Sequence, residues 1–199
     1  MCNEQRNRIA AGLIRDDFQQ LRIPLDFPEE IPNLEPRDSI RITDSNAIIR
    51  GSEKGGAELV VRRWSWPGTN GKPVYNFRSE GRRFPNGRCL IVADGFYEFT
   101  DPPTDAAGPA RKLKQKWLFT KRGEAWFAIA GLWRALPAVG EAYTMLTTEP
   151  GPDMASYHDR QVVVIERSDW AAWLDPSASP EHLLRPAPAG TFDVQRIDR

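Results

Sequence analysis

Short runs of β-branched and aromatic residues, separated by turn signals, constrain the fold of this chain more than any other feature. The turn signals include PGTNGK, PNG and EPGPD. Runs of this length and composition are typical of strands bounded by turns. The predicted strands are IRITD (40–44), NAIIRG (46–51), ELVVRRWSW (58–66), RCLIVADGFYEFT (88–100), QKWLFTKR (115–122), AWFAIAGLWRAL (125–136), YTMLTTE (143–149), QVVVIER (161–167) and TFDVQRI (191–197). The sequence therefore predicts a β-rich α+β fold with six to nine strands.

Helical signals are few. Apolar residues at helical spacing predict an amphipathic helix over residues 8–21, followed by a proline-broken surface connection over 24–36. Ser168 is expected to cap a short helix that carries Trp170 and Trp173, and Ser179-Pro180 to begin another. The segment 101–114 reads as a flexible loop. With 199 residues, we expect one domain over 1–199, with its core at about 2–174 and a C-terminal extension at 175–199.

Composition excludes several classes of protein. The 27 basic and 27 acidic residues cancel, so any contact with nucleic acid must come from a local patch. Two cysteines make neither a disulfide framework nor a zinc site, so we expect no metal and no cofactor. No secretory leader opens the chain and no apolar run reaches membrane-spanning length. We therefore expect a cytoplasmic monomer that does not contact membranes.

Five stretches could carry chemistry, and each has an ordinary structural explanation. They are Cys2, YNFRSE (75–80), DGFYEF (94–99), TMLTTE (144–149) and YHDRQVVVI (157–165). Arg78 and Glu80 share a strand face and can simply pair. Glu98 can be a solvated strand residue, and His158 can be a loop residue bonded to Asp159. Cys89 and most tryptophans are expected in the core, and strand propensity alone explains the threonines.

Taken together and in order, several motifs resemble the SOS response-associated peptidase (SRAP) family, which shields abasic sites in DNA. They are Met1-Cys2, NFRSE (76–80), RCLIVADGFYEF (88–99), AGLW (130–133), TMLTTE and HDR (158–160). The resemblance implies a mixed α/β fold with a barrel-like sheet and a basic cleft for single-stranded DNA. It implies a catalytic group, here Cys2, Asn76, Glu98 and His158. It also implies phosphate contacts from Arg78 and Arg160, an aromatic wedge at Trp64 or Trp66, and Thr147 in the DNA-binding rim. The family usually reads MCGR at the N-terminus, whereas Asn3 and Glu4 follow Cys2 here.

The expected reaction explains why a cysteine follows the initiator methionine. Once Met1 is removed, by an aminopeptidase or by self-processing, Cys2 carries an amine and a thiol on adjacent carbons. The amine can condense with the aldehyde of an abasic sugar, and the thiol can close a thiazolidine ring. We expect Glu98 to act as general acid and base, His158 to move protons, and Asn76 to hold the amine. The resulting crosslink would place the protein on the nucleoid.

Two other functions remain open at this stage. The chain could be a single-strand-binding module in which Cys2 is incidental. It could also be a peptide hydrolase in which Cys2 attacks peptide bonds with His158 as its base.

Overall fold

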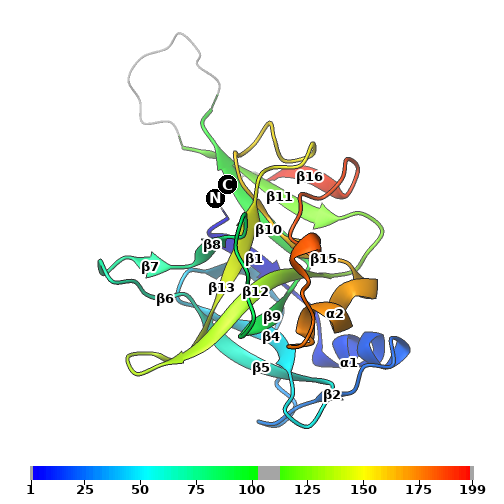
Figure 1. The fold of residues 1–199 in the computed structure, drawn as a ribbon. Coiled ribbons are helices and arrows are strands. Elements are labelled where there is room, and N and C mark those ends of the chain that lie inside the picture. The colour runs from blue at the N-terminus through cyan, green and yellow to red at the C-terminus, as the bar shows by residue number, and fades with distance from the viewer. Residues whose placement is uncertain (1, 103–112, 198–199) are drawn as a thin grey trace.

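Five strands close into a β-barrel, confirming the predicted β-rich fold with a barrel-like sheet (Figure 1). The computed structural model describes residues 2–102 and 113–197. Around the barrel β5 pairs with β4, β4 with β9, β9 with β12 and β12 with β13, and β13 returns to β5 in parallel at Tyr143 and Trp64. The barrel strands are β4 (Ser45–Gly51), β5 (Ala57–Trp64), β9 (Arg88–Ala93), β12 (Phe127–Leu136) and β13 (Gly140–Thr148).

A second sheet of five strands lies beside the barrel in the order β16-β11-β10-β1-β3. Its strands are β1 (Glu4–Asn7), β3 (Arg37–Arg41), β10 (Gly95–Thr100), β11 (Gln115–Lys121) and β16 (Phe192–Ile197). The run 88–100, expected as one strand, divides at Asp94 into β9 of the barrel and β10 of this sheet. Gly95 leaves room at the crossing, because a Cβ atom there would lie 2.7 Å from Leu118 Cδ1 and 3.2 Å from the carbonyl of Phe119.

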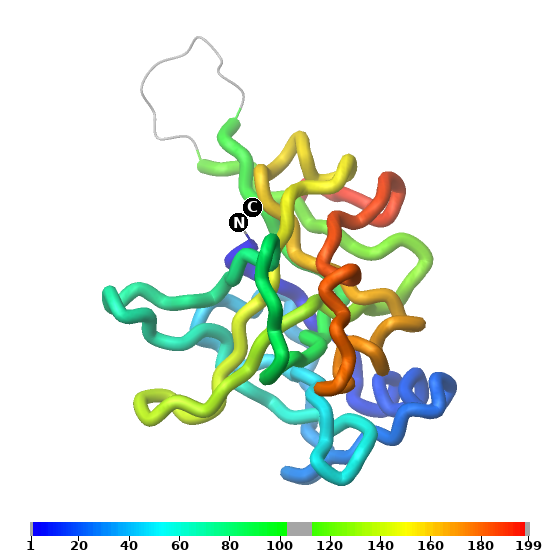
Figure 2. Tube along the Cα trace, viewed as in Figure 1, coloured from blue at the N-terminus to red at the C-terminus, as the bar shows by residue number. Residues whose placement is uncertain are grey.

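Short elements complete the fold (Figure 2). The helix predicted over 8–21 forms as α1, and the two later helical segments each begin one residue after the position expected for them. Neither Ser168 nor Ser179 caps its helix: the N-cap residues are Asp169 and Pro180. The short elements are β2 (Leu25–Asp26), β6 (Trp66–Pro67), β7 (Pro73–Val74), β8 (Asn76–Arg78), β14 (Gln161–Val162), β15 (Val164–Ile165), α1 (Ala11–Gln20), α2 (Trp170–Leu174) and the 3₁₀ turns η1 (Arg167–Asp169) and η2 (Glu181–Leu183).

The barrel wall is buried on both sides, which explains its uninterrupted apolar runs. Along β9, Leu90 and Val92 face a core beneath the helices, whereas Cys89 and Ile91 face a core shared with the second sheet. Cys89 is therefore a core residue, as expected. Strands covered on both faces lose the alternation of a half-exposed strand. The uninterrupted apolar run therefore reflects burial on two sides.

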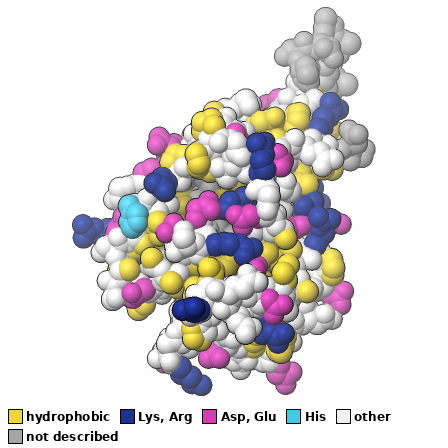
Figure 3. All heavy atoms as spheres, turned by 90° about the vertical axis from the view of Figure 1, so that its right-hand side faces the viewer, with side chains coloured by type: hydrophobic (Ala, Val, Ile, Leu, Met, Phe, Trp, Pro, Cys, Tyr) yellow, Lys and Arg dark blue, Asp and Glu magenta, His cyan; other side chains and the backbone are white. Residues whose placement is uncertain are grey.

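The two helices lie side by side over one end of the barrel (Figures 1 and 2). Phe18 of α1 stacks on Trp170 of α2 with ring centroids 5.1 Å apart, and Trp126 lies 4.9 Å from Trp170. Burying aromatic side chains of this size is a main source of stability in a small fold. This face of the molecule interleaves basic and acidic side chains (Figure 3), so it presents no large patch of one sign.

One predicted segment falls mostly outside the described residues, and one strand of the structure was not predicted. Most of the loop predicted over 101–114 falls on residues 103–112, which the structure does not describe. The sequence did not predict β1, whose four residues Glu-Gln-Arg-Asn carry no apolar side chain. In the described part of the chain, no helix has the length and apolar character needed to cross a bilayer.

Candidate functional site

Cys2 is a buried residue rather than a frayed end. Its side chain is 2% exposed, and its thiol donates a hydrogen bond of 3.4 Å to the carbonyl of Glu4. The segment continues directly into β1, which lies between β10 and β3. On the outer face Glu4 accepts a 2.6 Å bond from Lys116, whose ammonium group also lies 3.7 Å from the centre of the Tyr97 ring. These contacts fix the start of the chain against the second sheet.

Two polar side chains of β1 reach into the interior and hold the strand in register. Gln5 Nε2 donates a 2.6 Å bond to the hydroxyl of Tyr143, and Asn7 Nδ2 donates a 2.8 Å bond to Asn46 Oδ1. Buried hydrogen bonds of this kind specify one pairing, because a slip by one residue would leave each group without its partner. Sequence reasoning missed both residues, since polar residues in a short segment carry no strand signal.

Asn76 joins the barrel to Cys2. It begins β8, which runs parallel to β13 with Asn76 opposite Met145. Its side-chain amide donates a 2.7 Å bond to the main-chain carbonyl of Cys2. The oxygen of the same amide, Oδ1, is buried and accepts no hydrogen bond from the described residues. The side chain that binds Cys2 therefore carries an acceptor that the described residues leave unused.

Glu98 is a buried carboxyl group on the inner face of the second sheet. It is 2% exposed and lies two residues beyond Phe96, a core residue. Burial raises the pKa of Glu98 to about 7. A carboxyl group with this pKa can both donate and accept a proton near neutral pH.

The pKa of the Cys2 thiol is raised by the same buried surroundings. Burial raises the pKa of Cys2, and the charge of Glu98 raises it further. The thiolate is therefore disfavoured at neutral pH, because a buried thiol beside a carboxylate keeps its proton. Any reaction at this sulfur must remove that proton as the new bond forms.

His158 lies in a turn that packs against the partner strand of Glu98. Trp117 of β11 is opposite Glu98 in the register, so both side chains lie on one face. Tyr157 packs edge-on against Trp117, with ring centroids 5.0 Å apart. The charge of Asp159 also acts on Glu98. The turn that carries His158 therefore packs against Trp117, which lies on the same face of the sheet as Glu98.

The imidazole of His158 has two contacts at Nδ1. This atom accepts a 2.9 Å hydrogen bond from the backbone N–H of Arg160. Nδ1 also lies 2.8 Å from the carboxylate of Asp159, the contact expected from the sequence. Burial lowers the pKa of His158, and the Asp159 carboxylate is 83% exposed, so water screens its attraction for a charged imidazole.

Four of the five residues expected to contact DNA are buried. Trp64 is fully buried, stacks parallel to Tyr143 and donates from Nε1 to the carbonyl of Tyr75. Trp66 is 4% exposed, with the guanidinium of Arg134 4.0 Å above its ring. Neither tryptophan can stack on a base without leaving this packing. The structure therefore does not present the aromatic wedge that was expected at Trp64 or Trp66. Thr147 is 1% exposed, between β8 and β14.

The two arginines differ sharply. Arg78 is exposed on β8, two residues after Asn76, where a phosphate can reach it. Arg160 is 9% exposed, and its guanidinium is bound to Glu80 and Thr147. The expected pair of Arg78 with Glu80 does not form, because Glu80 is engaged by Arg160. Arg160 is not an open phosphate contact in this structure, which corrects the expectation.

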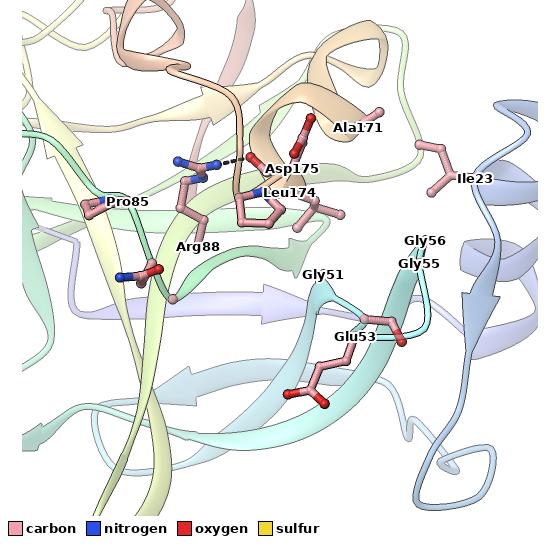
Figure 4. A pocket seen from close by; sticks show the side chains of 14 residues that line it. Ile23, Gly51, Glu53, Gly55, Gly56, Pro85, Arg88, Ala171, Leu174 and Asp175 are labelled. Atoms are coloured by element: carbon pink, nitrogen blue, oxygen red, sulfur yellow. Dashed lines mark hydrogen bonds between the residues drawn. The ribbon is translucent and has the colours of Figure 1, made fainter.

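A separate pocket of about 530 Å³ lies between the β4–β5 hairpin and the end of α2 (Figure 4). Its polar wall includes Arg88, which donates to the carbonyls of Trp173, Phe84 and Asp175. None of the nine predicted site residues lines it. Among the described residues, no group of three or more His, Cys, Asp or Glu side chains could hold a metal ion.

These features define a β-barrel protein that holds a buried carboxyl group and a side-chain amide beside a cysteine at the second position of the chain. The sequence model of the SOS response associated peptidase (SRAP) family matches residues 1–199. The chain belongs to this family.

The chain is also similar to curated relatives and, in its fold, to solved structures. The abasic site processing protein YoaM of Bacillus subtilis is 28% identical over 205 residues, covering 90% of this chain and 86% of that one. YoqW of the same organism, also named an abasic site processing protein, is 34% identical over 121 residues, covering 55% of this chain and 50% of that one. A phage-related protein of Bordetella bronchiseptica has a TM-score of 0.76 at 17% identity, covering 100% of this chain and 95% of that one. At that identity, the structural likeness concerns the fold.

Proposed function

We propose that this protein captures abasic sites in single-stranded DNA by forming a covalent crosslink through Cys2. The names of its relatives supply the substrate class. The observation that carries the proposal is the pairing of Cys2 with two polar groups. Asn76 holds its carbonyl at 2.7 Å, and burial gives the adjacent Glu98 a pKa of about 7.

In the proposed reaction, Met1 is first removed, which leaves the amine of Cys2 free. The amine nitrogen attacks C1′ of the open-chain sugar and forms a carbinolamine. Glu98 donates a proton to the departing hydroxyl and takes the proton of the nitrogen in return, so one water leaves and a neutral imine forms. The sulfur then bonds to the imine carbon while the thiol proton passes to the nitrogen through Glu98. The product is a thiazolidine, and the net change is the loss of one water.

The remaining groups have supporting roles in this proposal. The Asn76 Oδ1 atom accepts from the amine and so directs its lone pair away from Asn76 and toward the sugar. His158 donates from Nε2 to the sugar oxygen as the ring opens. The exposed guanidinium of Arg78 binds a neighbouring phosphate.

A raised thiol pKa does not obstruct this route but opposes the peptidase alternative. A cysteine peptidase relies on a thiolate, which requires a lowered pKa, whereas burial raises the pKa of Cys2. In the proposed route nitrogen reacts first, and the thiol meets an electrophilic imine within one ring closure. Acetylating the amine of Cys2 separates the two functions, because it stops thiazolidine formation but spares a thiol peptidase.

A denaturing gel tests the proposal. Protein is incubated with single-stranded oligonucleotides that contain or lack one abasic site and is then heated in detergent. We expect a slower-migrating band with the abasic oligonucleotide alone. Cys2→Ala should abolish the band, whereas Cys89→Ala, the same change at the buried core cysteine, should keep it. A band that persists in Cys2→Ala would overturn the proposal.

A further inference from the structure

The turn that carries His158 is attached to the C-terminal strand through the carboxylate of Asp153. One carboxylate oxygen, Oδ1, accepts a 2.9 Å hydrogen bond from the backbone N–H of Gly190, and the other, Oδ2, accepts one of the same length from Phe192. Hydrogen bonds to an ionised acceptor are stronger than those between neutral groups. Asp153 therefore ties the segment before β14 to the first residue of β16, 39 positions later in the sequence.

The same two segments also meet at Gly151. A Cβ atom at this position would lie 2.2 Å from the carbonyl oxygen of Ala187, so the two backbones are in direct contact there. On its other side, the backbone N–H of Gly151 donates a 2.9 Å hydrogen bond to Oε1 of Gln161, the first residue of β14. The start of the turn is therefore held between the C-terminal segment and β14.

Hydrogen bonds within the turn carry this attachment to His158. The carbonyl of Gly151 accepts from the backbone N–H of Met154 at 3.0 Å, and the carbonyl of Met154 accepts from that of His158 at 3.1 Å. Met154, the residue after Asp153, is fully buried in the core that contains Cys2. A shift of Asp153 would therefore move the backbone of His158 with it.

The other end of the attachment is fixed in the sheet that carries Glu98. In this sheet β16 pairs with β11, and β11 pairs with β10, the strand of Glu98. Phe192 also packs edge-on against Phe96 of β10, with ring centroids 5.4 Å apart. Because Phe96 lies two residues before Glu98, the link through Asp153 determines where the turn of His158 lies relative to Glu98.

We propose that Asp153 is a positioning residue, which ties the turn of His158 to β16 and so fixes the imidazole relative to the carboxyl group of Glu98. The proposal rests on the function proposed above, in which Glu98 and His158 act on the same sugar. It gives the C-terminal strand a part in the site, although none of its side chains takes part in the reaction. Placement matters because a shift of about 1 Å in a reacting group can slow a reaction by about 100-fold.

Asp153→Asn tests this link, because an amide has one acceptor oxygen and its NH₂ group would face a backbone N–H that needs an acceptor. We expect single-turnover capture at saturating abasic DNA to slow by about 10-fold, as for loss of one charge-assisted hydrogen bond. The affinity for an intact oligonucleotide should stay at the native value, because Asp153 touches no DNA in this proposal.

Asp193→Asn is the matched control. It makes the same change one residue beyond Phe192, at a carboxylate that is 58% exposed and lies 2.8 Å from Arg122, and it should react at the native rate. Rates are compared at a temperature where thermal unfolding shows all three proteins folded. Native rates in both variants, or equal slowing in both, would overturn the proposal. So would weaker binding of intact DNA by Asp153→Asn with a native rate at saturation.

A titration without DNA tests the link even if the proposed function fails. The imidazoles of His158 and His182 are followed by NMR in the native chain and in both variants. Burial lowers the pKa of His158, so release of its turn in Asp153→Asn should raise that pKa, whereas loss of a negative charge alone would lower it. Asp159 and Arg160, whose charges also act on His158, are the same in all three proteins.

The signals of His182, which lies on η2, serve as the internal reference. In Asp193→Asn the titration of His158 should match that of the native chain. An unmoved or lowered pKa of His158 in Asp153→Asn contradicts the link, whereas absence of capture by the native chain contradicts the proposed function alone.

Discussion

The side-chain amide of Asn76 donates a 2.7 Å hydrogen bond to the carbonyl of Cys2, 74 positions earlier in the chain. This bond brings the second residue of the chain to the barrel strand β13, which pairs with β8. It is the most direct link between the fold and the proposed nucleophile.

Asn76→Ala should slow covalent capture by about 10- to 100-fold, because losing one buried hydrogen bond costs about 1–3 kcal/mol. The single-turnover rate with an abasic oligonucleotide measures the effect. Gln20→Ala, an amide removed from the exposed end of α1, is the control and should react at the native rate. Equal rates for the two variants would remove Asn76 from the mechanism.

Glu98→Gln should make the fold more stable at pH 8 than the native chain, while leaving the two similar at pH 4. Burial raises the pKa of Glu98 to about 7 from its usual value near 4.5. The folded state therefore keeps this proton while the unfolded state loses it, and stability falls as pH rises between these values. The loss amounts to about 3 kcal/mol above pH 7.

Denaturant unfolding at the two pH values measures this difference. Glu53→Gln, at an exposed position of the β4–β5 hairpin, is the control and should show little dependence on pH. The same Glu98 variant should capture abasic DNA about 100-fold more slowly or worse, as expected for loss of a general acid. A stabilised variant that reacts at the native rate would place Glu98 outside the reaction.

Trp64→Phe should lower stability by about 1–3 kcal/mol without altering the salt dependence of DNA binding. The larger ring fills the core and its Nε1 donates 2.9 Å to the carbonyl of Tyr75. Thermal unfolding and binding titrations with intact single-stranded DNA give the two quantities. Weaker DNA binding at native stability would show that this tryptophan contacts bases after all.

Asp17→Ala should be among the more destabilising single substitutions, at about 3 kcal/mol. Asp17 is buried and accepts from Trp126 Nε1 at 2.6 Å and from Arg167 at 2.8 Å. Removing it leaves the indole N–H without its acceptor and Arg167 without one of its two carboxylates. Asp16→Ala, on the exposed side of the same helix, should change the unfolding free energy by less than about 0.5 kcal/mol.

The sequence predicts the barrel strands well because they are buried on both faces, so that runs such as Cys89–Ala93 are apolar without interruption, whereas the barrel-like sheet itself was implied by the family resemblance. It does not predict β1, since the inward-facing residues Gln5 and Asn7 are held by hydrogen bonds rather than by apolar burial. Strand propensity and apolar periodicity indicate which residues are buried. They do not indicate which polar side chains form hydrogen bonds with each other.

The same limit applies to the site. Cys2, Asn76, Glu98 and His158 were named from motifs, and the structure places the first three in mutual contact or within electrostatic reach. Arg160, Thr147, Trp64 and Trp66 were expected at a DNA surface, and burial removes all four from it. Arg78 faces solvent and Arg160 does not, because Arg160 pairs with the carboxylate of Glu80. That pairing depends on the tertiary fold, so the sequence motifs do not show it.

Intact-mass spectrometry of the purified protein, alone and after reaction with an abasic oligonucleotide, tests the central claim most directly. The account predicts a chain that has lost Met1 and an adduct whose mass is that chain plus the oligonucleotide minus one water. An adduct that still contains Met1 would contradict the account, because its nitrogen would then be an amide that cannot form the ring.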